Sequence, residues 1–270
     1  MTPPVAAHPD APRTVLLTGA AGLVGGFLRA SLPKYGYALR LFDRLPVAGE
    51  PAACTGDLLD PEALAAAVAG VDAVVHLAAI PTEAAFPDIL AANIDGTYRL
   101  YEAVRAAGVR RVVLASSNHA VGFGERPADG GLLRIDTPHR PDTYYGLSKC
   151  FAEDLAALYA DKHGIETVSL RIGSCFPEPS TVRMLSTWLS PADCGRLVHA
   201  ALGAAVAGHQ AVYGISANTR GWWDLEPGRR LGYHPRDDAE EFAPKLLAAH
   251  GEPAADDPEF RYVGGAFTTF

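Results

Sequence analysis

Short apolar runs alternate with longer stretches of helical periodicity between residues 14 and 172. The runs of strand length are Thr14–Thr18, Ala38–Asp43, Ala53–Asp57, Val71–Leu77, Arg111–Ser116 and Glu166–Ile172. Helical patterns lie between them, one ending near Leu32, one covering Pro61–Ala69, one running from about Pro87 to Gly108 and one from about Thr143 to Gly164. Strands that alternate with helices pair in parallel through right-handed crossovers, which cover both faces of the sheet. We therefore expect an α/β fold built on a doubly wound parallel sheet.

The remaining parts of the chain depart from this pattern. Residues 1–13 are rich in proline and alanine and lack a basic segment followed by an apolar one, which predicts a flexible tail rather than a signal peptide. Residues 14–172 are predicted to form a Rossmann domain. Residues 173–270 contain Pro177, Pro179 and the pair Trp222–Trp223 and are predicted to be a small substrate-binding lobe, packed on the sheet edge within one structural unit. We interpret the two tryptophans as packing residues rather than a sugar-stacking site.

Composition narrows the class of ligand. The 270 residues carry 23 basic and 31 acidic side chains, a net charge of −8, without a Lys/Arg cluster. A nucleic-acid partner is therefore not expected. The longest apolar stretch, Ala63–Ile80, contains Asp72 and His76, so a membrane span is not expected either. The four cysteines are far apart and lack zinc spacing, which predicts reduced thiols, no metal site and a cytoplasmic location.

A glycine-rich turn follows the first strand, in Thr18-Gly-Ala-Ala-Gly-Leu-Val-Gly25. Gly19 permits a tight turn, Gly22 lets a pyrophosphate approach the backbone, and Gly25 allows close packing of the next helix. The helix start would then face the phosphates. An ordinary turn is the alternative, but the position after the first strand favours a dinucleotide site.

Two carboxylates extend this cofactor prediction. Asp43 ends the second strand, where it can accept both ribose hydroxyls and repel a 2′-phosphate. NAD is therefore favoured, although Arg44 leaves NADP open because an arginine can pair with phosphate. Asp57 ends the third strand and is a candidate for holding the adenine amino group. The predicted cofactor contacts are Gly19, Ala21, Gly22, Leu23, Gly25, Asp43, Asp57, Leu58, Leu77, Tyr145 and Lys149.

Tyr145 and Lys149 lie four residues apart in a predicted helix, which places the phenol and the ammonium on one face. A phenol has a pKa near 10, and lowering it by ~3 units requires roughly 4 kcal/mol, which a fixed neighbouring cation can supply. Considered alone, the pair would be interpreted as a core tyrosine and a solvated lysine. Because the sequence also contains the glycine turn, we expect Tyr145 to be a general base and Lys149 its supporting cation. Tyr144 has Ser148 four residues on and therefore no such partner.

Ser117, Asn118 and His119 follow the fifth strand, where parallel sheets present ligand-binding loops. Ser117 is predicted to donate to the reacting oxygen, completing a Ser-Tyr-Lys catalytic set. Asn118 and His119 are predicted donors toward a polyhydroxylated substrate, with loop solvation the alternative for His119. Asn93 is a candidate bridge between the active-site loop and the backbone, or an ordinary buried hydrogen-bonding residue.

Together these motifs resemble the extended branch of the short-chain dehydrogenase/reductase family, from Thr14 onward. The long strings Ser116–His119, Tyr145–Phe151, Arg171–Pro179, Arg183–Trp188 and Val212–Asp224 resemble the members of this branch that oxidise hexuronic acids. The resemblance implies NAD-dependent oxidation of galacturonate or glucuronate at C1 to an aldarolactone.

The same resemblance implies a set of substrate contacts. Arg183 would grip the substrate carboxylate, and Ser174 would share that carboxylate or a ring hydroxyl. The predicted substrate contacts are Ser117, Asn118, His119, Tyr145, Ser174 and Arg183. Pro81 stands where the resemblance leads us to expect a small hydroxyl residue, so either Thr82 replaces that contact or it is absent.

Two other functions fit parts of the pattern. A nucleotide-sugar epimerase or dehydratase of the same branch would need a larger C-terminal lobe than the 98 residues after position 172. A non-catalytic NAD-sensing protein would not need the tyrosine and the lysine together. By analogy with the wider family we also expect a homo-oligomer.

Overall fold

The core of the protein is a seven-stranded parallel sheet in the order β3-β2-β1-β4-β5-β6-β9. The computed structural model describes residues 14–254 and 257–270, so the predicted tail of residues 1–13 lies outside the described residues. The strands are β1 (Thr14–Thr18), β2 (Ala38–Asp43), β3 (Cys54–Thr55), β4 (Ala73–His76), β5 (Arg111–Ser117), β6 (Glu166–Ile172) and β9 (His209–Gly214). This arrangement confirms the predicted doubly wound α/β fold.

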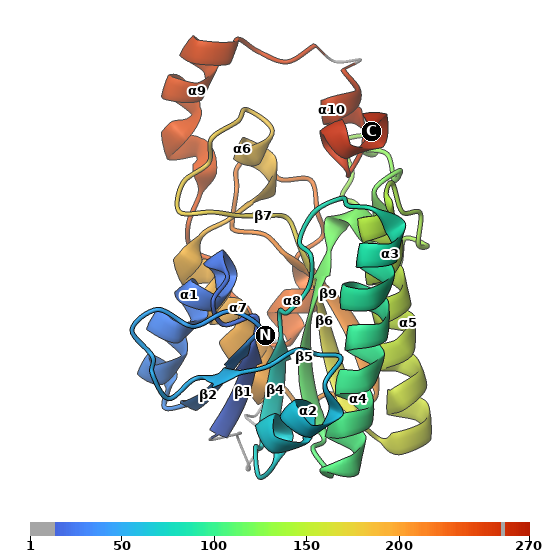
Figure 1. The fold of residues 1–270 in the computed structure, drawn as a ribbon. Helices are drawn as coiled ribbons and strands as arrows, with labels where there is room; N and C mark the ends of the chain where they lie inside the picture. Colours follow the sequence, from blue (N-terminus) through green and yellow to red (C-terminus); the bar gives the residue numbers. More distant parts are fainter. Residues whose placement is uncertain (1–13, 255–256) are drawn as a thin grey trace.

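Helices cover both faces of the sheet (Figure 1). One face carries α1 (Leu23–Ser31) and α7 (Pro191–Gly203), and the other carries α2 (Pro61–Val68), α4 (Gly96–Ala106) and α5 (Tyr144–His163). The alternation along β1 explains why two cores form, because Val15 and Leu17 pack on the side of α1 while Leu16 packs on the side of α2.

Local signals set the ends of the longest helix. The Thr143 hydroxyl accepts a hydrogen bond from Gly146 N at 3.0 Å and so caps the start of α5. Gly164 ends the helix in the left-handed region, with φ 64°. These two residues fix the position at which Tyr145 enters the site.

The predicted helix from Pro87 to Gly108 is three segments in the structure. Residues Phe86–Ile89 form α3, residues Leu90–Asp95 form a π-helical turn, and α4 follows without a break. A π turn contains one extra residue per turn, which hydrophobic periodicity does not reveal. It lies at Asn93, whose side chain is buried.

The predicted boundary at residue 172 does not separate the sheet from the lobe. Both α7 and β9 come after it in the chain, and β9 pairs with β6 as the last strand of the sheet. The regularity of the sheet therefore extends to Gly214. Its edge strand was missed because the first half of β9 is only partly buried and lacks a continuous apolar run.

The remaining segments gather beyond the carboxyl ends of the strands, at the top of Figure 1. They are β7 (Ser174–Cys175), α6 (Met184–Thr187), β8 (Trp188–Leu189), α9 (Ala243–His250) and α10 (Pro258–Arg261), with short 3-10 turns at Asn118–Val121, Ala239–Phe242 and Gly265–Thr269. Helix α8 (Glu226–Arg230) lies beside β9 instead, and a further 3-10 turn, Leu32–Tyr35, directly follows α1. Trp222 and Trp223 stack with ring centroids 3.9 Å apart inside a buried cluster that includes Tyr213 of β9, so they are packing residues, as predicted.

Three of the cysteines are buried and Cys54 is exposed, and all four are free thiols. Within residues 14–254 and 257–270, no helix combines the length and the hydrophobicity that crossing a membrane requires.

Candidate active site

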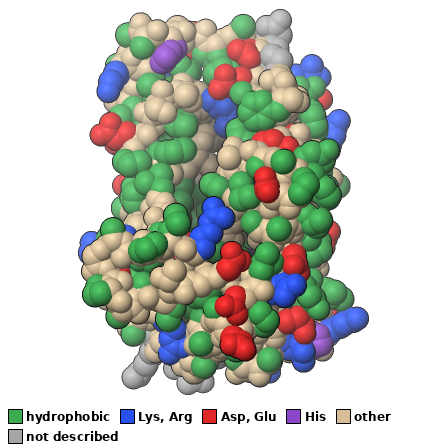
Figure 2. All heavy atoms as spheres, in the orientation of Figure 1, with side chains coloured by type: hydrophobic (Ala, Val, Ile, Leu, Met, Phe, Trp, Pro, Cys, Tyr) green, Lys and Arg blue, Asp and Glu red, His purple; other side chains and the backbone are tan. Residues whose placement is uncertain are grey.

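A single cavity of about 840 Å³ runs along the carboxyl ends of the strands. Figure 2 shows it as a hollow on the face drawn there. All eleven predicted cofactor contacts line it, as do Ser117, His119, Ser174 and Arg183. Asn118 does not line it and is described below. The fold thus brings together side chains from the ends of six strands, β1 to β6, and from the C-terminal segment.

The glycine turn has distinct requirements at each position. Gly19 has φ 71°, and a Cβ there would lie 2.7 Å from Ala78 N. A Cβ at Gly25 would lie 2.3 Å from Gly19 O. These two glycines are required by the fold itself. Gly22 has an ordinary φ of −73°, and a Cβ there would meet a single atom at 3.3 Å, so the fold alone does not explain the glycine.

This end of the cavity fits a dinucleotide. Helix α1 begins after Gly22 with no side-chain cap and no acidic residue in its first turn, which leaves its first amides free for an anion. The Asp43 carboxylate accepts hydrogen bonds from Ala21 N and Leu45 N, both at 2.9 Å, and lines the cavity. Its oxygens each keep a lone pair for a ribose hydroxyl. The residues present therefore suit NAD.

Asp57 and Arg44 also line this end of the cavity. Asp57 is exposed, and its carboxylate accepts a hydrogen bond from Leu59 N at 2.8 Å. This contact orients the carboxylate at the place predicted for the adenine. Leu58 is buried beneath it.

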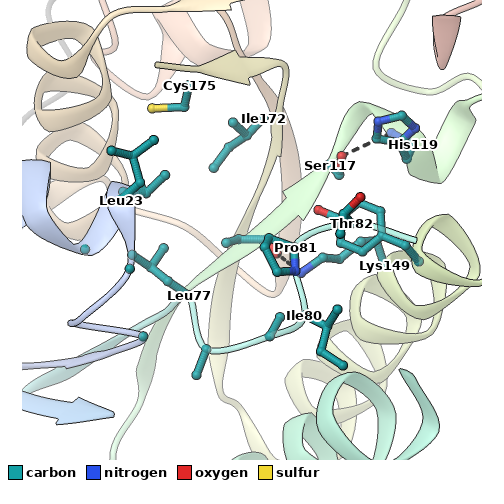
Figure 3. A pocket seen from close by; sticks show the side chains of 18 of the residues that line it. Leu23, Leu77, Ile80, Pro81, Thr82, Ser117, His119, Lys149, Ile172 and Cys175 are labelled. Atoms are coloured by element: carbon teal, nitrogen blue, oxygen red, sulfur yellow. Dashed lines mark hydrogen bonds between the residues drawn. The ribbon is translucent and has the colours of Figure 1, made fainter. Parts of the chain in front are cut away.

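Figure 3 shows the middle of the pocket, with Leu23, Ile172 and Cys175 on one side and Ser117, His119 and Lys149 on the other. One wall is thus apolar and suits a flat ring, while the other is polar and suits a reacting group. Tyr145 belongs to the polar wall and is 8% exposed. The Lys149 Nζ atom lies 5.4 Å from the centroid of the Tyr145 ring and donates to Ala115 O at 2.9 Å.

The electrostatics of this pair differ from the prediction. Burial raises the pKa of Tyr145 to about 12, and the hydrogen bond with Ser117 offsets only part of that rise. Burial also lowers the pKa of Lys149 to about 8. Lys149 therefore does not by itself offset the effect of burial on the phenol, and its joint action with the positive nicotinamide ring stays a prediction. The reason is geometric, because the ammonium lies near the ring and its hydrogen bond goes to a backbone carbonyl.

Arg183 lies at the far end of the cavity, half-buried, with its Nη2 donating to Val263 O. It makes no salt bridge with any carboxylate in residues 14–254 and 257–270. Burial lowers its pKa to about 10, so it stays protonated at neutral pH. Ser174 lies on β7, and its hydroxyl is 2.8 Å from the Thr187 hydroxyl. This end of the cavity can hold an anion.

Asn118 does not face the cavity. Its Nδ2 donates to Val263 O at 3.1 Å, and its Oδ1 accepts from the Ser117 hydroxyl at 3.2 Å. The side chain is buried and ties Ser117 to the C-terminal segment, so it does not point at the substrate as expected, and a substrate contact of Asn118 stays a prediction. Its neighbour His119 does line the cavity, and its ring lies 4.2 Å from that of Phe267.

Asn93 forms the bridge considered in the sequence analysis. Its side chain accepts from Ile80 N at 2.8 Å and donates to Ile80 O at 3.0 Å and to the Ser148 hydroxyl at 3.1 Å. It thereby connects α5 to the loop of Pro81 and Thr82, both of which line the cavity.

Three residues near the site were not predicted. The Glu83 carboxylate accepts from Tyr145 N at 2.9 Å. Asp142 accepts from His119 Nδ1 at 2.7 Å. Phe267 lines the cavity beside His119. Asp142 directly precedes the cap of α5, which is a weak signal; the other two carry no local motif.

Comparison with known proteins places the chain in a family. The family model described as the NAD-dependent epimerase/dehydratase family matches residues 15–202. The chain belongs to this family. Among its members, the uronate dehydrogenase of Pseudomonas putida is 48% identical over 261 residues, which are 94% of this chain and 94% of the relative. The uronate dehydrogenase of Agrobacterium fabrum is 45% identical over 260 residues, 94% of this chain and 96% of the relative.

Solved structures agree with this family assignment. The crystal structure of uronate dehydrogenase from Agrobacterium tumefaciens matches with a TM-score of 0.88 at 44% identity, covering 96% of this chain and 97% of the other. A variant of that enzyme complexed with NAD matches with a TM-score of 0.89 at 43% identity, with the same coverage. The resemblance found in the sequence motifs is thereby confirmed.

Proposed function

We propose that this protein is an NAD-dependent enzyme that oxidises a hexuronic acid, galacturonate or glucuronate, at C1 to the aldarolactone. The observation that carries the proposal is that Tyr145, Lys149 and Arg183 line one cavity, with the glycine turn at its other end. Relatives named uronate dehydrogenase, 45–48% identical over 94% of the chain, support it.

The glycine turn and Asp43 bind the cofactor and fix its orientation. When bound, NAD supplies the acceptor for the hydride that leaves C1 and a positive ring whose charge favours the Tyr145 phenolate. Tyr145 takes the proton of the C1 hydroxyl. The Ser117 hydroxyl turns from Asn118 Oδ1 and donates its hydrogen bond to the same substrate oxygen as it becomes a carbonyl. Lys149 adds positive charge beside the phenol. The chain thus positions the groups and moves one proton.

The substrate is held by its charge at the far end. Arg183 binds the carboxylate, and Ser174 donates to it or to a ring hydroxyl. Pro81 has no N–H and no side-chain donor, so Thr82 is the residue of that loop able to contact a sugar hydroxyl. Because galacturonate and glucuronate differ at C4, this loop is where preference between them is set.

The test is NADH formation, followed by absorbance, with a panel of sugars. Galacturonate and glucuronate are expected to react, and galactose and glucose to react at least ~100-fold more slowly, since they lack the anion for Arg183. Glucose 6-phosphate and L-arabinose belong in the panel because relatives at 38% and 40% identity are named dehydrogenases of these sugars. Turnover of UDP-sugars without net NADH would instead indicate an epimerase.

Two further predictions remain part of the proposal. We propose a homo-oligomer, supported by exposed apolar side chains on neighbouring helices, among them Phe86, Tyr98, Tyr144 and Leu147. Size-exclusion chromatography with light scattering tests it. The cytoplasmic location stays a prediction from the sequence, as does the substrate-binding role of the C-terminal lobe.

A further inference from the structure

A buried carboxylate lies directly behind the substrate end of the cavity. The side chain of Asp142 has no exposed surface, and its Oδ2 atom is 2.7 Å from His119 Nδ1. His119 is its one ion-pair partner within 4.0 Å in residues 14–254 and 257–270. A buried carboxylate is costly unless it is hydrogen-bonded, so its partners indicate what it is for.

The surrounding backbone is shaped to admit this carboxylate. A Cβ at Gly122 would lie 2.2 Å from Asp142 Oδ2, one at Gly264 would lie 1.7 Å from the same atom, and one at Gly146 would lie 2.9 Å from Oδ1. These glycines come from three separate segments. A side chain at any of the three positions would enter the space that the carboxylate fills, so the glycines leave room for Asp142.

The hydrogen bonds around Asp142 determine which way each proton points. The Thr143 hydroxyl accepts from Gly146 N at 3.0 Å, so its own proton goes to Asp142 Oδ1, 3.0 Å away. An ionised carboxylate accepts only, so the proton between Oδ2 and the imidazole belongs to His119 Nδ1.

The other ring nitrogen of His119 remains for the cavity. No group in the described part of the chain hydrogen-bonds Nε2, and that atom is not among the buried unpaired ones. Tyr145 and Phe267 contact the imidazole ring, with centroids 5.7 Å and 4.2 Å away. The ring is therefore fixed by the carboxylate at Nδ1 and by contacts with two aromatic rings, and His119 lines the cavity together with Tyr145.

We propose that Asp142 is a positioning residue that holds the His119 proton on Nδ1, so that Nε2 accepts a hydrogen bond from a ring hydroxyl of the sugar acid, in place of the donor role expected from the sequence. The identity of the substrate rests on the function proposed above, whereas the tautomer does not. A site with an acceptor here selects substrates that carry a hydroxyl at the matching carbon and disfavours those that carry an oxo or ether group.

The tautomer is measured directly in the wild-type protein. Nitrogen-15 NMR at pH 8, with the His119 signals assigned by comparison with His119→Gln, should show a protonated Nδ1 and an unprotonated Nε2. A proton on Nε2, alone or together with Nδ1, would overturn the proposal. This experiment needs no substrate, so its result stands whether or not the protein oxidises uronates.

The role of Asp142 is tested by a double-mutant cycle. In Asp142→Asn the Thr143 proton keeps the amide oxygen on its side, so the amide NH2 faces His119 and forces the opposite tautomer. We expect kcat/KM for the preferred uronate to fall ~10–100-fold, mainly through KM, as for loss of other groups that orient a histidine. The Kd for NAD should change less than ~2-fold, because Asp142 does not line the cavity.

Measuring Asp142→Asn in a His119→Ala protein distinguishes a positioning role of Asp142 from a purely structural one. If Asp142 acts through His119, Asp142→Asn should change kcat/KM less than ~2-fold in a His119→Ala protein. An equal loss in both backgrounds would refute the proposal. Asp161→Asn, the same change at an exposed position of α5, is the matched control and should leave kcat/KM and the melting temperature unchanged.

Discussion

Replacing Arg183 with glutamine should separate charged from neutral substrates. Its guanidinium is half-buried, hydrogen-bonded to Val263 O, and without a carboxylate partner in the described part of the chain. A substrate carboxylate would bind this guanidinium through two charge-assisted hydrogen bonds, each worth about 1.5–3 kcal/mol. Allowing for the amide contact that glutamine retains, the loss is about 3–4 kcal/mol, or roughly 100- to 1,000-fold in kcat/KM for uronates.

Stability should hardly change in this variant, because two effects oppose each other. Burial lowers the pKa of Arg183 from 12.5 to about 10, so the folded state holds the charge less well than the unfolded chain. At pH 7 Arg183 is protonated in both the folded and the unfolded state, so the full cost of burying its charge opposes folding. Because the side chain is partly exposed, that cost is about 1 kcal/mol. Loss of the hydrogen bond to Val263 O costs about the same.

The assay compares initial rates of NADH formation on galacturonate, glucuronate, galactose and glucose for wild type, Arg183→Gln and Arg134→Gln. Arg134 is a surface arginine paired with Asp136 and serves as the control. The reasoning predicts a large loss on the two uronates and almost none on the neutral sugars. An equal loss on all four sugars, or a melting temperature lowered by more than roughly 5 °C, would refute it.

Three other changes test the cofactor end. Gly25→Ala places a Cβ 2.3 Å from Gly19 O, so it should destabilise the fold by ~1–3 kcal/mol and weaken NAD binding. Gly26→Ala places a Cβ with no atom within 4 Å, so it should stabilise α1 by about 0.5–1 kcal/mol and leave the NAD Kd unchanged. Thermal unfolding and NAD titration check both variants. Asp43→Asn should raise the KM for NAD about 10-fold and increase the NADP/NAD ratio of kcat/KM; an unchanged ratio would exclude its ribose role. Lys149→Met should be more stable than wild type at pH 7 by at most about 3 kcal/mol, because burial lowers the pKa of Lys149 from 10.5 to about 8. Between pH 8 and pH 10.5 the unfolded wild-type chain binds more protons than the folded one, so wild-type stability should rise toward that of the variant as the pH increases. A stability difference between the two proteins that grows over this range would contradict the lowered pKa of Lys149.

The parts of the fold that follow from local pattern were predictable. β1, β2 and β6 have the predicted bounds, because each is a short run ended by a glycine or by a charged turn. The helix α5 follows from Thr143 and Gly164 in the same way. The π turn at Leu90–Asp95 was not predictable, since one added residue leaves an apolar pattern that still reads as a helix.

The residues of the site also differ in whether the local sequence predicts them. The glycine turn and Asp43 are adjacent in the fold for reasons visible in a single strand–helix unit, so they could be predicted. Phe267 reaches the cavity because the C-terminal segment returns to the residues after β5, where Val263 N donates to Gly124 O, and nothing near Phe267 in the sequence indicates that path. Asn118 was misplaced because its amide is taken by Val263 O, 145 residues later.

The acidity of the catalytic pair also depends on residues that are far away in the sequence. Spacing predicts that Tyr145 and Lys149 share a helix face, and they do. Spacing does not reveal that both become buried, and burial acts on the pKa of each in the direction that opposes charge. The environment of the pair, set by residues from other elements, decides its acidity.

The central claim is that Tyr145, as its phenolate, takes the proton of the C1 hydroxyl. The most direct test is single-turnover NADH formation by Tyr145→Phe, with galacturonate at saturation and NAD binding measured separately. The account predicts a hydride-transfer rate at least ~1,000-fold below wild type with the NAD Kd within ~3-fold. A variant that binds NAD normally and keeps more than about a tenth of the wild-type rate would contradict it.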